Sequence, residues 1–141
     1  DINIFGKDGK AERDVYADFL DEASLILGKP DLKSVAQQFR ASAAAWNDLS
    51  AALLPDWSPP LAETRQLMLR QHRLFLDEGA TSLSERQTIG DRLKVIRGQM
   101  EEDFPLNEAE VVGLQGAIAE QVLRIHDIEA AAVADLRRVM G

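Results

Sequence analysis

Apolar residues that recur every three or four positions from Ala11 to the end of the chain are the feature that most limits its fold. The clearest pattern follows Asp31, a good N-cap residue, and its apolar positions fall on one side of an α-helix: Leu32, Val35, Ala36, Phe39, Ala43, Trp46, Leu49 and Leu53. From Ala11 onward no stretch alternates polar and apolar residues as a half-buried strand would. The pattern therefore predicts an all-α fold.

Helix-stopping residues divide the pattern into about five helices. The first helix starts near Ala11 and stops at Gly28 and Pro30. One face of it is predicted to carry Tyr16, Phe19, Leu20, Ala23, Ile26 and Leu27. The helix that follows Asp31 runs to Leu54, and a third runs from Pro60 to near Gly79.

Two capping-box patterns mark the remaining helix starts. Ser84 with Gln87 predicts the start of a fourth helix, which stops around Asp103. Asn107 with Glu110 predicts the start of a final helix of roughly 30 residues, or about 45 Å. Short connections between these segments favour an antiparallel bundle of about five helices with a long C-terminal helix.

The 141 residues suit one domain, so residues 11–141 are expected to form a single helical bundle domain. Residues 1–10 are interpreted as a linker or stub from an upstream domain, with a frayed terminus as an equal alternative. The chain begins at Asp1 without a methionine, which favours an excised domain.

Composition excludes several classes of function. A net charge of −8 repels nucleic-acid phosphate, and no apolar run approaches the roughly 18 to 20 residues of a membrane span. No signal peptide is visible, so a cytoplasmic location without a membrane partner is expected. The chain has no cysteine, which excludes a thiol nucleophile, and neither histidine has a glutamate three residues before it. We therefore expect no catalytic residue, metal or cofactor in this chain.

A local basic cluster in the predicted third helix is the main candidate binding site. It consists of Arg65, Arg70, His72 and Arg73. Arginine pairs in a two-point geometry with carboxylates and phosphates, so the cluster is a candidate for receiving such a group. More often, such a cluster pairs with acids of the same chain, here Asp77, Glu78 or those between Glu101 and Asp103.

His126 is a second candidate for ligand binding. Helical bundles carry phosphotransfer histidines, but Ile125, Asp127, Ile128 and Glu129 surround His126 with bulk and negative charge. The favoured interpretation is a boundary histidine that is hydrogen-bonded to a neighbouring helix.

Four sequence blocks carry a resemblance to a known family: residues 16–23 (YADFLDEA), 72–79 (HRLFLDEG), 103–110 (DFPLNEAE) and 125–129 (IHDIE). They resemble the helical C-terminal domain of unknown function in butirosin biosynthesis protein H-like proteins, which are mostly bacterial. The similarity extends from about Phe5 to Met140. In that family an upstream domain similar to papain-type cysteine peptidases carries the nucleophile, and the named member transfers an acyl group from a carrier protein to an aminoglycoside antibiotic.

The resemblance implies an accessory domain of an acyltransferase that shapes access of the substrate or the acyl carrier. Its expected partners are the N-terminal domain of the same polypeptide and an acyl carrier protein. The alternative is a structural bundle that associates with itself, as a homodimer, through residues Ala117 to Val139. Whether the full-length parent is an active enzyme stays open at this stage.

Overall fold

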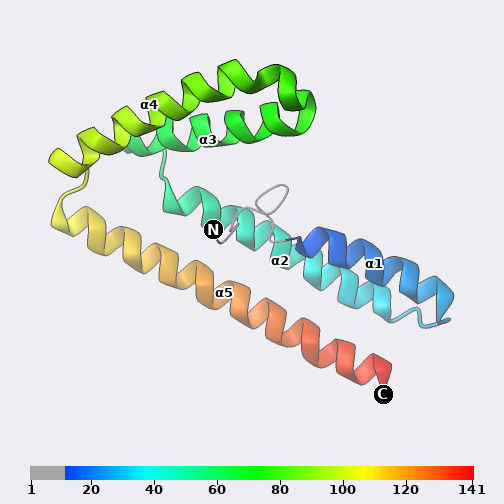
Figure 1. Cartoon of the computed structure of the whole chain (residues 1–141). Helices are drawn as coiled ribbons and strands as arrows, with labels where there is room; N and C mark the ends of the chain where they lie inside the picture. Colours follow the sequence, from blue (N-terminus) through cyan, green and yellow to red (C-terminus); the bar gives the residue numbers. More distant parts are fainter. Residues whose placement is uncertain (1–11) are drawn as a thin grey trace. The chain divides into compact units, whose positions relative to one another are not determined.

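A computed structural model describes residues 12–141, and all the regular structure in that range is helical (Figure 1). The elements in chain order are α1 (Arg13–Ile26), α2 (Leu32–Leu53), α3 (Pro59–Glu78), the 3-10 helix η1 (Gly79–Ser82), α4 (Leu83–Glu102) and α5 (Glu108–Met140). The predicted all-α class and the long C-terminal helix are confirmed, since α5 has 33 residues. The predicted linker at residues 1–10 lies outside the described residues.

The described chain divides into two compact units. The terminal unit contains residues 12–52 together with Gln115–Gly141, and the hairpin unit contains Leu53–Leu114. Helix α5 contributes its first residues to the hairpin unit and the rest to the terminal unit. The expectation that residues 11–141 form a single domain stays a prediction.

The core of the terminal unit is formed by α1, α2 and the C-terminal part of α5. Its buried members are Ala17, Leu20, Leu32, Val35, Ala36, Phe39 and Ala132. Polar bonds stabilise the same unit: Lys29, in the connection between α1 and α2, donates through Nζ to the carbonyl oxygen of Val139 on α5 at 2.8 Å. Arg40 of α2 bridges Asp18 and Asp21 of α1, each at 2.7 Å. Of the apolar positions predicted along α2, the first four belong to this core, Ala43 and Leu49 are buried elsewhere, and Trp46 and Leu53 are half-buried.

The predicted apolar face of α1 is wrong in part. Leu20 is buried as expected, but Phe19 and Ile26 are 58% and 81% exposed. Apolar residues occupy more than half of the circumference of α1, so only one side of that surface can meet α2 and α5. The side that is buried carries Ala17, Leu20 and Ser24, and the side with Phe19 and Ile26 is exposed.

The hairpin unit is built by α3 and α4, which η1 connects (Figure 1). Leu61 of α3 and Ile89 and Ile96 of α4 are buried. An ion pair between Arg92 Nε and Glu63 Oε1 at 2.7 Å also links the two helices. Gly79 has a φ of 54° at the end of α3, a conformation that costs glycine little.

The two predicted capping boxes differ in outcome. At α5 the box is confirmed: the Asn107 backbone N–H donates to Glu110 Oε2 at 2.8 Å, and the Glu110 N–H donates to Asn107 Oδ1 at 3.0 Å. The prediction at Ser84 is wrong, because η1 continues directly into α4 and that helix begins at Leu83. Ser84 and Gln87 therefore lie inside α4 rather than at its start.

Candidate functional site

A carboxylate held by three side chains links the helices of the terminal unit. Glu129 of α5 accepts hydrogen bonds at Oε1 from Arg13 Nε at 2.7 Å, Ser42 Oγ at 2.7 Å and Trp46 Nε1 at 3.0 Å. A second bond joins Arg13 Nη2 to Oε2 at 3.2 Å. One acid of α5 is thereby bonded to both α1 and α2.

The environment of Glu129 favours its ionised form. Partial burial of the carboxylate raises its pKa, but the bonds from Arg13, Ser42 and Trp46 together lower the pKa to about 2. The carboxylate therefore stays charged at all physiological pH values. Because Arg13 neutralises that charge, the group is suited to holding the three helices together rather than to accepting a proton from a substrate.

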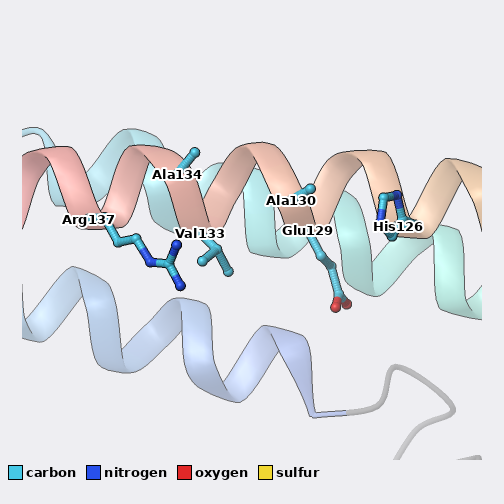
Figure 2. Close-up of a pocket in the computed structure, with 6 residues that line it drawn as sticks. All are labelled: His126, Glu129, Ala130, Val133, Ala134 and Arg137. Atoms are coloured by element: carbon cyan, nitrogen blue, oxygen red, sulfur yellow. The ribbon is translucent and has the colours of Figure 1, made fainter.

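A shallow pocket of about 410 Å³ lies along α5 beside this network (Figure 2). It is lined by His126, Glu129, Ala130, Val133, Ala134 and Arg137. Glu129, Val133 and Arg137 point from α5 toward α1, whereas Ala130 and Ala134 lie on the opposite edge (Figure 2). The pocket thus has an apolar middle, with a histidine at one end and an arginine at the other.

Of the predicted ligand-binding residues, His126 is the one that lines this pocket. Its side chain is 73% exposed, and its Nδ1 lies 3.1 Å from Oδ1 of Asp127 on the same helix. The expected hydrogen bond to a neighbouring helix is wrong, because the ring points into solvent along α5. A role of His126 in ligand binding stays a prediction.

The predicted basic cluster lies on α3 in the hairpin unit, where two of its arginines form ion pairs. Arg65 pairs with Asp56, and Arg70 pairs with Glu85 at the start of α4. These acids differ from the ones expected, Asp77, Glu78 and the group near Glu102. His72 is half-buried and Arg73 is exposed. The structure thus places the four residues on one helix, where Arg70 and Arg73 are both exposed.

No family model, no curated protein and no solved structure matches the chain. Within residues 12–141, no three side chains of the metal-binding types form a group that could hold a metal ion. None of the helices in that range is long and apolar enough to cross a membrane.

Sequence reasoning missed Glu129 and Arg137, and a signal for Glu129 is visible in retrospect. In the final helix an apolar row runs through Ile125, Ala132 and Leu136, and Glu129 takes the place between Ile125 and Ala132 at helical spacing. An acid on the apolar side of a helix requires a partner when the helix packs. The identity of that partner, Arg13, has no local signal because it lies 116 residues away.

The outward side of α1 is the second notable surface of the terminal unit. Val15, Phe19 and Ile26 are 60%, 58% and 81% exposed. Each is two positions from a buried residue of α1, and two positions on an α-helix are about 200° apart. These three residues, called the α1 stripe below, thus lie opposite to the core.

Proposed function

We propose that this chain is an accessory helical domain that docks on a neighbouring domain of the same polypeptide through the α1 stripe. By the resemblance described above, that neighbour is the acyltransferase-type domain of a butirosin biosynthesis protein H-like protein. The docked helices would border the entrance used by the substrate or the acyl carrier. The observation that carries the proposal is the row of large apolar side chains exposed opposite to the core of the terminal unit.

The spacing of the α1 stripe supports docking of an extended partner surface. Val15, Phe19 and Ile26 follow one another at four and seven residues, which places them in one line along the helix. Contiguous exposed apolar surface of this kind marks interaction sites more often than single exposed residues do. The line gives a partner an apolar strip about three turns long.

Aromatic packing fixes the central residue of the stripe. Tyr16 packs edge-on against Phe39 of α2, with ring centroids 4.7 Å apart, and its ring stacks with that of Phe19 at 5.9 Å. Phe19 is thereby supported from one side and open on the other. A rigid exposed aromatic ring is the kind of residue that contributes most to binding at protein interfaces.

The charged residues near the α1 stripe indicate which charge a partner surface should carry. Glu22 is exposed and lies in line with the stripe, between Phe19 and Ile26. The one arginine of α1, Arg13, is bonded to Glu129 instead. A matching surface would therefore present apolar side chains with a lysine or arginine opposite Glu22.

A matched pair of substitutions in the full-length polypeptide tests the proposal. Val15→Ser and Val112→Ser remove the same side chain at positions that are 60% and 63% exposed, but only Val15 belongs to the stripe. We expect Val15→Ser, and more strongly Phe19→Ser, to lower the rate of acyl transfer at least fivefold, while Val112→Ser leaves it unchanged. Circular dichroism would confirm that the variants keep their helical content. Equal rates for all three variants would overturn the proposal.

The proposal also includes binding of an acyl carrier protein by the basic cluster on α3. Since Arg65 and Arg70 are paired internally, Arg73 is the arginine best placed to meet an acidic carrier. Arg73→Ala is expected to raise the KM for the loaded carrier and leave kcat unchanged. An unchanged KM for the Arg73→Ala variant would show that the cluster does not bind the carrier.

Self-association is the second candidate function. The middle of α5 exposes Val122 and Leu123, at 49% and 63%, which is apolar surface that a second copy would cover. Light scattering of the isolated chain at high concentration would show a dimer that Leu123→Ser dissociates. A monomer at all concentrations would exclude this candidate.

A further inference from the structure

One arginine of the terminal unit, Arg137, differs from the others because it forms no ion pair with a carboxylate of the described residues. Arg13, Arg40, Arg124 and Arg138 each form an ion pair with a carboxylate. Among the described residues, Arg137 has no carboxylate partner, although Arg138 beside it pairs with Asp135 at 2.7 Å. Arg137 is also the arginine that lines the pocket (Figure 2). Its guanidinium donors are therefore available to an anion from outside the terminal unit.

Beside Arg137 the pocket is apolar. Ala130, Val133 and Ala134 lie between His126 and Arg137 along the helix axis, and Val133 is 38% exposed. Ala130 and Arg137 are about 10 Å apart along the helix axis. This surface can cover one side of a short hydrocarbon chain or an aromatic ring.

The carboxylate in the pocket does not prevent an anion from binding at Arg137. Glu129 is paired with Arg13 through two hydrogen bonds. It also lies about 12 Å from Arg137 along the helix axis, which exceeds the screening length of about 8 Å at physiological salt. An anion at the Arg137 end of the pocket therefore meets one open cation and a neutralised acid.

We propose that the α5 pocket binds a small organic anion with an apolar body. The carboxylate, sulfonate or phosphate group of the ligand pairs with the guanidinium of Arg137, and its hydrocarbon part covers Val133 and the adjacent alanines. The paired Glu129 closes the apolar part on the side of α1. This site is separate from the α1 stripe, so its existence does not depend on the docking proposal.

Titration with sodium octanoate, followed by amide chemical shifts of the isotope-labelled chain, tests the site. Octanoate is expected to shift the amides of residues 126–137 in a saturable way, and octanol, which has the same chain without the charge, is expected to bind at least tenfold more weakly. Arg137→Gln should weaken octanoate binding about tenfold, as expected for the loss of a charged hydrogen-bonding partner. The spectrum itself reports whether the variant is folded.

Arg138→Gln is the matched control, because it removes the neighbouring arginine that is already paired with Asp135. Binding within twofold of the unsubstituted chain is expected for this variant. The proposal is overturned if octanoate causes no saturable shifts, if the shifts fall on residues 15–26 instead, or if Arg137→Gln and Arg138→Gln weaken binding equally.

Discussion

Arg13 and Glu129 form a two-point ion pair across 116 residues of sequence, with Arg13 Nε 2.7 Å from Oε1 and Nη2 3.2 Å from Oε2 of the carboxylate. The side chains are 35% and 25% exposed, so the pair is partly shielded from water. Ser42 and Trp46 donate to the same carboxylate. Because these donors come from α1 and α2, the charge of Glu129 is coupled to the packing of all three helices of the terminal unit.

Acid should destabilise the chain in part through Glu129. Its pKa is about 2 when folded and near 4.5 when unfolded, so its contribution is present above pH 4.5 and is lost as the pH falls through 2. The contribution is of order 2 kcal/mol, which is less than the full shift implies because a quarter of the side chain is exposed. Glu129→Gln should therefore show a flatter pH dependence of the free energy of unfolding between pH 4.5 and 2, measured by urea denaturation.

Glu120→Gln is the control for this measurement, since Glu120 is an exposed acid of the same helix. It should retain the pH dependence of the unsubstituted chain. An identical pH profile for Glu129→Gln and the unsubstituted chain would show that the ion pair contributes nothing to stability.

Ser42→Ala tests the hydroxyl donor of the network. Ser42 is fully buried, and its Oγ donates to the ionised Glu129 at 2.7 Å. Hydrogen bonds to charged groups contribute more than neutral ones, so we expect a loss of about 1 to 2 kcal/mol in the free energy of unfolding. Ser34→Ala, at an exposed position of the same helix, should change it by less than about 0.5 kcal/mol. Equal effects of the two substitutions would contradict the importance of this bond.

Much of the fold follows from local sequence signals. The apolar row of α2 predicts six of the eight buried residues of that helix and misses Ser42 and Ala45. Gly28 marks the end of α1 and has a φ of 61°. Asn107 and Glu110 mark the start of α5 because both partners of the capping box lie within one helical turn.

The start of α4, the buried side of α1 and the partners of Glu129 could not be predicted from local sequence patterns. At Ser84 the local pattern is correct for a cap, yet the Ser82 hydroxyl bonds to the carbonyl oxygens of Leu74 and Gly79, and the chain is already helical at Leu83. On α1, the apolar residues surround most of the helix, so the choice of core side depends on α2 and α5. The partners of Glu129 are likewise determined by tertiary packing.

The two sides of α1 should respond differently to the same substitution. Leu20 is 2% exposed and belongs to the core, whereas Leu25 is 74% exposed. Leu20→Ala should lower the free energy of unfolding by about 2 to 5 kcal/mol, because it removes buried methyl groups and leaves a cavity. Leu25→Ala should change it by less than about 0.5 kcal/mol. Similar losses for both variants, measured by urea denaturation, would show that α1 packs by a different side.

The capping box of α5 should act as a coupled pair. Asn107 satisfies the Glu110 N–H and Glu110 satisfies the Asn107 N–H, so removal of either side chain leaves one helix-terminal donor without its partner. We expect Asn107→Ala to cost about 1 kcal/mol in the free energy of unfolding, and Ser84→Ala, inside α4, to cost less than about 0.5 kcal/mol. In a double-mutant cycle, Glu110→Ala should cost less in the Asn107→Ala background than alone, because the first substitution frees the end of the helix to fray. Strictly additive costs would indicate that the two bonds stabilise the start of α5 independently.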